Sequence, residues 1–312
     1  MLSRIADSLF WLNRYMERSE GLLRVIHTNY ILSLDDGTAN LSWRPILELF
    51  SNANEEQVNE LEFQTNKAIQ YLIAGERNNN SLKEIIGKAR ENARGIQDHI
   101  TKEVWEHVNQ MYHHTLDQRF NNQLYHTDVL PLIDELLRST ILYAGIIDTT
   151  MPRGIGWSFM NLGRLTERCL LTTQLARRQF EETTYNSAHE RDILYWRNLL
   201  LSLSGYEHHL KTYRSTDTHL NVVDQLILDK NFPRSVKYSL NRIEKYMQDV
   251  VKGNQSQEAR QLSLEYSRFN SRIQFADMFY IQQQGVIEFL GQVQKDLYQF
   301  TNQLGQTFFS YS

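Results

Sequence analysis

The all-helical character of this chain is decided by its opening stretch, residues 1–26, which read MLSRIADSLFWLNRYMERSEGLLRVI. Apolar residues recur there at intervals of three and four positions, the spacing that places them on one side of an α-helix. The opposite side carries aromatic and charged residues. A helix with an apolar stripe on one side and large aromatic residues on the other is expected to be covered on both, so its charges must be paired. The stripe consists of Leu2, Ile5, Leu9, Leu12, Met16, Leu23 and Ile26, and the opposite side of Phe10, Trp11, Arg14, Glu17 and Arg18.

The pattern of this first helix returns in the second half of the chain. The segment Arg14-x-x-Glu17-Arg18 recurs 150 residues later as Arg164-x-x-Glu167-Arg168. Two further matches follow in the same order, at offsets of 153 and 151 residues: Trp43-Arg44 with Trp196-Arg197, and the segment from Asn80 with the segment from Asn231. Three matches at a nearly constant offset predict an internal duplication, with halves at residues 1–147 and 148–312.

Composition favours the same fold class. Gly and Pro number only 14 and 4 in 312 residues, too few for the frequent turns of a β-sandwich or propeller. We therefore predict an all-α helical bundle, a single domain over residues 1–312, built from two duplicated multi-helix halves packed around a shared core. The helices are expected at about 2–26, 42–50, 55–74, 82–94 or 82–111, 124–147, 155–181, 188–209, 217–229, 233–252 and 257–309.

Charge and cysteine content exclude several classes of protein. The net charge of −4 gives no indication of a nucleic-acid partner. The single cysteine, Cys169, excludes a scaffold held by internal disulfides, and its place in an apolar stripe favours a buried core thiol. No apolar run approaches the roughly 20 residues of a membrane-spanning helix. Charged residues interrupt the N-terminal stretch, so we expect no targeting segment, no membrane partner and a cytoplasmic location.

The two motif helices raise a question of charge balance. Arg14 and Arg18 lie four positions apart, where like charges repel on a helix surface, and Glu17 neutralises only one of them. If the motif helices meet, Arg14 is expected to reach Glu167, and Arg164 to reach Glu17. The motifs would then form one cluster of ion pairs between the two halves.

This predicted cluster holds four arginines and only two glutamates. Either further acids, such as Asp148 and Glu91, close the balance, or an anionic ligand does. Guanidinium groups bind carboxylate and phosphate through two parallel hydrogen bonds, so a phosphate, a carboxylate or an acidic peptide is the expected ligand class. The alternative is a structural ion-pair network that clamps the two halves together.

Two further segments are candidates for the same ligand site. Arg90, Glu91 and Arg94 carry ion-pair spacing on one helix, which indicates either an extension of the anion site or an ordinary solvated face. Arg153 lies in the loop before the second motif helix, with Gly154 and Gly156. Glycines before a helix N-terminus can bind anions, although no recognised phosphate-loop pattern is present.

Motifs for metal binding and nucleophilic catalysis are missing from the sequence. His99, Glu103 and His107 would share one face of a continuous helix, but no Glu-x-x-His or His-Glu-x-x-His segment accompanies them, so we predict no metal. The chain has no Gly-x-Ser-x-Gly, no P-loop and no dinucleotide-binding glycine pattern, so we expect no cofactor. The apolar segment 308–311 is expected to dock on the chain's own core, or else on a partner.

The order of these motifs resembles the bacterial alpha-E family, an all-helical domain with a hallmark Glu-Arg motif. The similarity extends over almost the whole chain. Phe10 and Asn13 depart from the family pattern, in which tyrosine and glycine are common, and Asn80-Ser81 lacks the usual proline. The segments that carry the resemblance are 1–20, 89–94, Glu103-x-Trp105-Glu106, Asn109, Asp148-x-Thr150, Arg153, Trp157-x-Phe159, 162–168 and 233–236.

The resemblance implies partners rather than a reaction. Members of the family tend to be encoded beside, or fused to, circularly permuted ATP-grasp ligase-like proteins and transglutaminase-like peptidases. This association implies a system that makes, modifies or trims a peptide or amide-linked product. Within such a system the helical member would bind substrate, product or enzyme.

Three hypotheses about function remain open. The first is a non-catalytic accessory protein that binds an anionic ligand or a ligase through its Arg/Glu site. The second is an enzyme that uses Glu17 or Glu167 as a general acid or base, although flanking arginines lower the pKa of a carboxyl group and suit a base poorly at neutral pH. The third is a purely structural helical scaffold.

Overall fold

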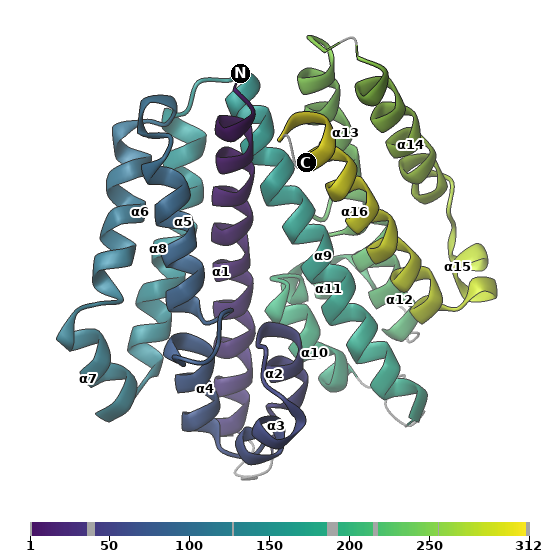
Figure 1. Ribbon diagram of the computed structural model, residues 1–312. Coiled ribbons are helices and arrows are strands. Elements are labelled where there is room, and N and C mark those ends of the chain that lie inside the picture. The colour runs from purple at the N-terminus through teal and green to yellow at the C-terminus, as the bar shows by residue number, and fades with distance from the viewer. Residues whose placement is uncertain are drawn as a thin grey trace. The chain divides into compact units, whose positions relative to one another are not determined.

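The computed structural model describes residues 2–35, 41–126, 128–185, 193–214, 218–254 and 256–309. Within these ranges the chain forms sixteen α-helices, labelled in Figure 1, and no β-strand. The predicted all-α class is therefore confirmed. None of the helices in this part of the chain has a stretch long and apolar enough to cross a bilayer.

The chain divides into two compact units. Residues 11–152 form the N-terminal unit, and residues 1–10 together with 153–312 form the C-terminal unit. Helix α1 (Ser3–Asp35) gives its first turns to the C-terminal unit and the remainder to the N-terminal unit. The internal duplication and the shared core stay predictions.

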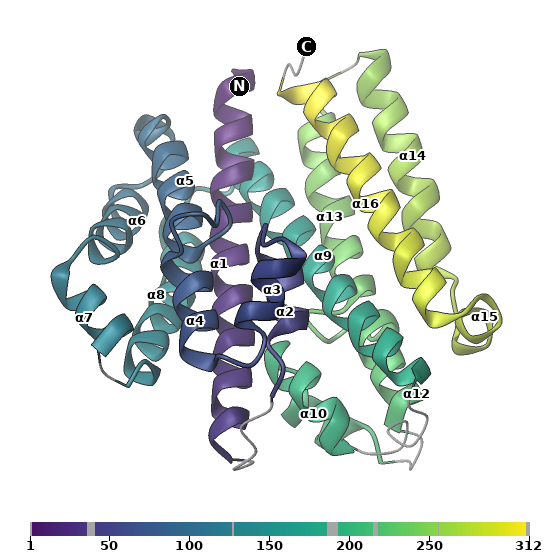
Figure 2. The ribbon, with the colours of Figure 1, turned by 60° about the horizontal axis from the view of Figure 1, so that its bottom comes forward.

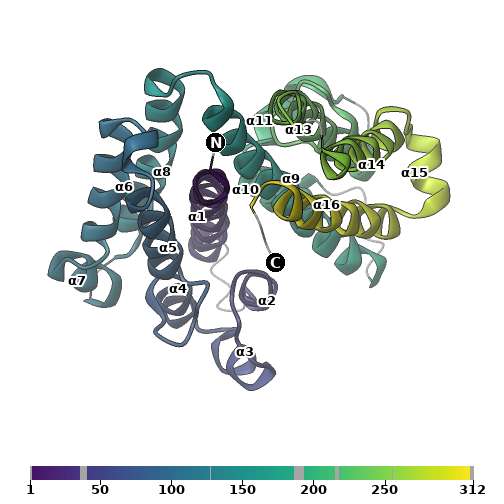
Figure 3. The same cartoon turned by 45° about the horizontal axis from the view of Figure 1, so that its top comes forward.

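In the N-terminal unit the later helices pack in succession. Helix α5 packs against α4 and α6, and α6 packs against α8. Helix α8 is bonded to α1 by a hydrogen bond from Tyr143 Oη to Asn13 Oδ1 (3.5 Å) and by a contact of 3.1 Å between His27 and Asp134. Figure 3 shows α5, α6 and α8 on the same side of α1. The helices after α1 are α2 (Arg44–Phe50), α3 (Glu55–Leu61), α4 (Thr65–Ala74), α5 (Leu82–Arg94), α6 (Lys102–His114), α7 (Gln118–His126) and α8 (Leu130–Thr150).

The C-terminal unit is organised around four long helices. Helix α9 contacts α13 and α16, and both of these contact α14, so α9 and α14 lie at opposite corners of a four-helix arrangement (Figures 2 and 3). The helices of this unit are α9 (Ile155–Tyr185), α10 (Ile193–Ser202), α11 (Tyr206–Thr212), α12 (Thr218–Val223), α13 (Val236–Val251), α14 (Gln257–Gln274), α15 (Met278–Gln284) and α16 (Val286–Phe308), with a π-helix at Asp224–Leu228.

Helix α1 is covered on both of its sides, as the sequence predicts. Leu9 and Leu12 of the apolar stripe have no exposed surface. On the opposite side Phe10 is also fully buried, and Arg14 and Glu17 are 6% and 4% exposed. Phe10, Arg14 and Glu17 on the aromatic and charged side are therefore buried, whereas Trp11 and Arg18 on the same side are half-buried.

A close approach of two backbones fixes the start of α1 against α9 inside the C-terminal unit. A Cβ atom added to Gly163 would overlap the carbonyl oxygen of Phe10 and lie 2.9 Å from its carbonyl carbon. Only glycine leaves room for a backbone at that position. Asn13, the residue that matches Gly163 in the first motif, is itself buried at 3% exposure and accepts the hydrogen bond from Tyr143.

Several predicted helices are broken into shorter ones. The helix expected over 55–74 is α3 and α4, and the segment 82–111 is α5 and α6 with a short 3-10 helix (Gln97–His99) between them. The stretch 124–147 begins within α7, and α8 starts separately at Leu130. Residues 257–309 form three helices rather than one, because Asp277 caps α15 and Gly285 adopts a φ of 90° before α16.

Equivalent serine caps open one helix in each predicted half. The Ser81 side chain accepts a hydrogen bond from the backbone of Glu84 at the start of α5, as predicted. The Ser235 side chain accepts one from Tyr238 at the start of α13. Ser235 therefore caps α13 as Ser81 caps α5. Asn231, which the sequence match pairs with Asn80, is not the cap of α13.

The apolar C-terminal segment docks on its own unit, which was the favoured expectation. The Phe309 ring lies 5.3 Å from that of Phe10 and 5.9 Å from that of Phe159, and Phe308 packs edge-on against Phe159 at 5.5 Å. Residues 310–312, the rest of the predicted segment, lie outside the described residues. The aromatic cluster joins α16 to α9 and to the first turns of α1.

Candidate functional site

The motif of α1 is held by burial and by an aromatic ring. Arg14 and Glu17 are nearly inaccessible, and Arg18 is half-buried. The Arg14 guanidinium lies over the Trp11 ring, with its central carbon 4.6 Å from the ring centroid. This cation–π contact helps to hold the guanidinium in place. Farther along α1, Arg24 and Glu20 form an ion pair of 2.8 Å between positions four apart.

The motif of α9 also has a buried glutamate, but its first arginine is less buried than Arg14. Glu167 is 2% exposed, whereas Arg164 and Arg168 are half-buried. Arg164 donates a hydrogen bond of 2.7 Å to Asn161 Oδ1, one turn earlier on the helix. In both motifs the glutamate is deeply buried and the arginine after it reaches partway to the surface.

Arg153, in the loop before α9, contacts a side chain of that helix. Its guanidinium carbon lies 3.6 Å from the centroid of the Trp157 ring, and the residue as a whole is exposed. Arg153 has interactions within the chain besides this ring contact, and the ring restricts where its guanidinium can lie.

Burial of these charges requires partners, and every motif residue has one. Each of Arg14, Glu17, Arg18, Arg164, Glu167 and Arg168 takes part in interactions within the chain. A charged group removed from water is retained in a folded protein only when opposite charge and hydrogen bonds compensate it. The chain therefore contains a buried Arg/Glu salt-bridge network. The specific pairing of Arg14 with Glu167, and of Arg164 with Glu17, stays a prediction.

The third candidate segment forms a compact group on α5 and α6 (Figure 1). Arg90 Nε donates to Asn109 Oδ1 at 2.9 Å, and another nitrogen of Arg90 donates to Glu91 at 2.8 Å. The Arg90 guanidinium also lies over the Tyr112 ring at 4.7 Å. Glu91 bonds Arg94 as well, at 2.6 Å.

Exposure divides this third group into a fixed part and a solvated part. The Arg90 side chain is only 20% exposed, whereas those of Glu91 and Arg94 are 52% and 59% exposed. Arg90 thus has a defined orientation with several partners, and the Glu91–Arg94 pair is an ordinary surface ion pair of small energetic weight.

The ten predicted site residues fall in both units. Arg14, Glu17, Arg18, Arg90, Glu91 and Arg94 belong to the N-terminal unit, and Arg153, Arg164, Glu167 and Arg168 belong to the C-terminal unit. Direct contacts join Arg90, Glu91 and Arg94 to one another. That all ten form one ligand site stays a prediction.

The contacts between arginine and tryptophan near the two motifs were not predicted from the sequence. Trp11 precedes Arg14 by three positions on α1, a spacing that brings side chains together on a helix, whereas Arg153 lies in the loop before α9 and its contact with Trp157 is not explained by helical spacing. The spacing of Trp11 and Arg14 was available in the sequence. The stacking of Arg90 on Tyr112 joins two different helices and had no comparable local signal.

The histidine and carboxylate residues examined as metal ligands have other roles. His99 lies in the 3-10 helix before α6, so it does not share a helix face with Glu103 and His107. His107 contacts the backbone oxygen of Ser139 at 2.8 Å from Nε2 and is buried. In the described ranges no three His, Cys, Asp or Glu side chains gather in a way that could hold a metal ion.

Cys169 follows the second motif directly and is fully buried. Burial raises the pKa of its thiol, because a thiolate loses its hydration in an apolar environment. We expect native protein to react with a thiol reagent such as DTNB at least about 100-fold more slowly than protein unfolded in denaturant, because only the thiolate attacks. Rapid labelling of native protein, measured by absorbance, would contradict the burial.

A polar cluster at the π-helix makes stability depend on pH. His209 is 3% exposed, and its Nδ1 lies 2.8 Å from Oε1 of Gln225. Burial lowers the pKa of His209, with a smaller contribution in the same direction from His208. A histidine held neutral in the fold stabilises above its unfolded pKa of about 6.5, and this stability is lost as the pH falls and the unfolded chain takes up a proton.

We therefore expect the free energy of unfolding to decrease below about pH 6.5, by at most about 1.4 kcal/mol per pH unit from this group. His209→Asn, which keeps a nitrogen donor near Gln225, should flatten this slope in denaturant titrations at pH 5, 6 and 7. The exposed His99 supplies the control, because His99→Asn should leave the slope unchanged. An identical slope in all three proteins would exclude His209 as its source.

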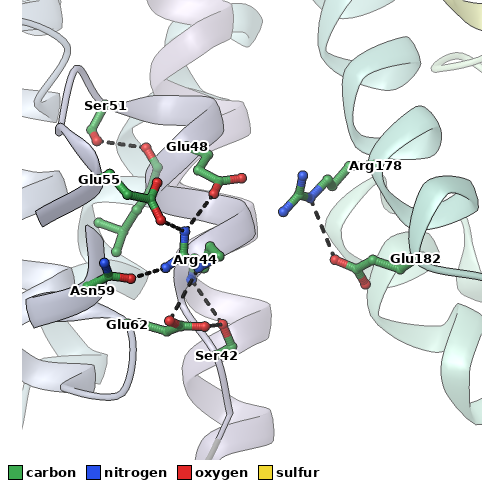
Figure 4. Close-up of polar contacts among 10 residues, drawn as sticks. Ser42, Arg44, Glu48, Ser51, Glu55, Asn59, Glu62, Arg178 and Glu182 are labelled. Carbon is green, nitrogen blue, oxygen red and sulfur yellow. Dashed lines mark hydrogen bonds and ion pairs between the residues drawn. The ribbon is translucent and has the colours of Figure 1, made fainter. Parts of the chain in front are cut away.

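A second polar cluster closes α2 onto α3 and involves none of the predicted site residues. Figure 4 shows the Arg44 side chain between Glu48, Glu55 and Glu62, which its nitrogens contact at 3.2, 2.8 and 3.2 Å. Hydrogen bonds with Glu55 and then Glu48 raise the pKa of the Arg44 guanidinium above its ordinary value. The cluster is a structural clamp at the surface of the N-terminal unit.

A cavity of about 320 Å³ lies between α14 and α16. Its walls carry Glu265, Arg268, Arg272 and Asp296 over the rings of Tyr266, Phe269 and Phe300, and none of the ten predicted site residues lines it. Arg272 is paired with Asp296, and Glu265 accepts hydrogen bonds from Gln261, Gln299 and Gln303. The charges of this cavity are therefore largely balanced within its own walls.

The two long helices α1 and α9 each carry Arg-x-x-Glu-Arg with a buried glutamate. These features define a class of all-helical domains that contain a buried Arg/Glu network. The chain belongs to the Alpha-E family, described as a predicted alpha-helical domain with a conserved ER motif, whose model matches residues 1–309. Glu17-Arg18 and Glu167-Arg168 both supply that dipeptide. The resemblance inferred from the motifs is thus confirmed. Neither a curated protein nor a solved structure matches the chain.

Proposed function

We propose that this protein is a helical accessory protein of an ATP-grasp-associated system that makes or modifies a peptide or an amide, and that its motif arginines hold a carboxylate- or phosphate-bearing ligand or partner. The observation that carries the proposal is the duplicated Arg-x-x-Glu-Arg, in which four arginines accompany two buried glutamates. An excess of guanidinium groups with restricted solvation favours an anion of fixed geometry.

Arg18 and Arg168 are the residues best suited to the ligand. Each follows a buried glutamate and is itself half-buried, so part of the residue is accessible to a ligand. Both already have interactions within the chain, and an incoming anion would share or exchange them. The five donors of a guanidinium group allow such sharing.

Arg90 and Arg153 extend the proposed anion-binding set. Each has its guanidinium stacked on an aromatic ring, which fixes its plane without using its N–H donors. Such fixed planes reduce the conformational entropy that binding must overcome. Glu91 and Arg94 belong to the same set, and their side chains are exposed to solvent.

The burial of Glu17 and Glu167 favours a structural role for these acids over catalysis. A catalytic acid or base must come within hydrogen-bond reach of its substrate, and both carboxylates are at most 4% exposed. In this proposal the ATP-grasp-type ligase carries out the nucleotide chemistry. A transglutaminase-like protein would act in the same system as a second partner.

The proposal is tested first by ligand binding. We expect inorganic phosphate or a glutamate-rich peptide to raise the melting temperature of the protein in a thermal-shift assay, because a ligand of the native state stabilises it. Arg18→Gln and Arg168→Gln should each reduce the affinity about 10-fold or more, which corresponds to the loss of one charge-assisted hydrogen bond. Arg119→Gln, an exposed arginine outside the motifs, is the matched control.

The second test is association with the ligase. Full-length protein and a tagged ATP-grasp-type ligase encoded beside it should co-purify, and Arg18→Gln or Arg168→Gln should weaken the complex if the motif contacts the ligase itself. No stabilisation by either anion, together with no association and no change in ligase turnover, would contradict the proposal.

A further inference from the structure

Helix α8 has one face packed in the N-terminal unit and one apolar face left uncovered. The packed face carries Leu136, Thr140, Tyr143 and Ile147, all at most 4% exposed. On the other face Ile141 and Leu142 are 47% and 55% exposed, and apart from the helix's own backbone no atom of the described residues lies within 4 Å of a Cβ added to Gly145. Large apolar side chains next to an open glycine in the middle of a helix are unusual for a face in contact with water.

The exposed residues of this face follow the spacing of a helix–helix seam. Arg138, Ile141, Gly145 and Asp148 lie at positions i, i+3, i+7 and i+10, and all four are exposed. This alternation of three and four residues is the pattern by which two helices pack side by side. The seam has a small apolar centre, with a positive charge toward its N-terminal end and a negative charge toward its C-terminal end.

The seam is complementary to itself when the helix direction is reversed. A two-fold axis at the level of Tyr143 places Arg138 opposite Asp148 of the second copy and Ile141 opposite Gly145 of the second copy. Two-fold symmetry makes each of these pairings occur twice. A parallel arrangement would instead bring the two Arg138 side chains together and the two Asp148 side chains together, which repel.

We propose that α8 is a homodimerisation surface, on which α8 of a second copy packs antiparallel with Ile141 against Gly145 and Arg138 against Asp148. Gly145 provides the space that the Ile141 side chain of the other copy fills, because nothing else in the described chain occupies it. Arg138 makes no hydrogen bond or ion pair with any residue of the described ranges, so it is available to a carboxylate. Asp148 already has an interaction within the chain, and its carboxylate, with about four acceptor sites, can accept from Arg138 as well.

The size of the seam indicates a weak dimer. Positions 138 to 148 span about 15 Å of helix, which is shorter than the contact of a standard-size interface. We therefore expect the full-length protein to be monomeric at about 1 µM and increasingly dimeric toward about 200 µM, as for a dissociation constant of roughly 50 µM.

The experiment is sedimentation velocity of the full-length protein over this concentration range, with charge-exchange variants. Arg138→Asp and Asp148→Arg each create two like-charge pairs across the two-fold axis and should weaken the dimer at least about 10-fold. The double variant restores both opposite-charge pairs and should return the dissociation constant to within about threefold of the original. Circular dichroism of each variant checks that the monomer remains folded.

The apolar centre has its own matched pair of variants. Ile141→Lys should abolish the dimer, whereas Leu264→Lys on α14, at a nearly equal exposure of 48%, should leave it unchanged. A monomer at every concentration, a dimer that survives Ile141→Lys, or a folded double variant that does not regain affinity would each overturn the proposal. These measurements need neither ligase nor anion, so their outcome is independent of the proposed function.

Discussion

Replacing Gly163 by alanine is expected to lower the free energy of unfolding by about 3 kcal/mol or more. The added methyl group would overlap the carbonyl oxygen of Phe10 and lie 2.9 Å from the carbonyl carbon. A backbone carbonyl inside a helix cannot move aside as the end of a flexible side chain can, so α1 and α9 would have to separate. The gain in helix propensity from glycine to alanine, about 1 kcal/mol, is too small to offset this overlap.

Equilibrium denaturation of Gly163→Ala against Gly87→Ala measures the effect. Gly87 also lies inside a helix, but a Cβ there would meet only one Tyr112 carbon, at an ordinary contact distance of 3.8 Å. We expect Gly87→Ala to be neutral or stabilising by up to about 1 kcal/mol. Equal stability of the two variants would show that the crossing of α1 and α9 is not as close as the structure indicates.

The second large effect is expected from the buried carboxylate of α9. Glu167→Gln keeps the shape of the side chain and removes its charge, which leaves arginine charge of the buried network uncompensated. Breaking a buried ion pair from one side costs about 3–5 kcal/mol, and we expect a loss in that range. Glu17→Gln should behave alike, since Glu17 is buried to a similar degree.

Glu91→Gln is the control for this prediction. Glu91 bonds two arginines, but its side chain is 52% exposed, so its loss should cost less than about 1 kcal/mol. Chemical denaturation at pH 7 gives both values. A loss below about 1 kcal/mol for Glu167→Gln would exclude a sealed network and would favour a site in which a bound anion, absent from the purified protein, sets the charge balance.

The burial of α1 and the cap of α5 could be predicted because each depends on neighbours in sequence. The break between α3 and α4 could not. Residues 62–64 contain neither glycine nor proline, and the helix ends there because the Trp43 amide donates to Glu62 O at 2.8 Å and Arg44 bonds the Glu62 carboxylate. These contacts come from a distant segment and leave no local signal.

In the candidate site, too, features that depend on nearby residues could be predicted, and contacts between different helices could not. The Arg-x-x-Glu-Arg repeat, its buried glutamates and the Trp11–Arg14 contact follow from helical periodicity alone. The partners of Arg90 do not. On one continuous helix Arg90 and Asn109 would lie about 28 Å apart, whereas the turn at Gly95–Thr101 folds α6 back and brings Nε and Oδ1 within 2.9 Å.

The division of α1 between two units has a consequence for dissecting the protein. Residues 153–312 expressed alone would lack Phe10, whose ring fills the space beside Phe309 and whose backbone fits against Gly163. A cut at the apparent boundary would thus expose an aromatic surface and invite aggregation. Fragment complementation with a synthetic peptide of the first ten residues, or a circular permutant that joins them to the other end, is the route by which this half can be isolated intact.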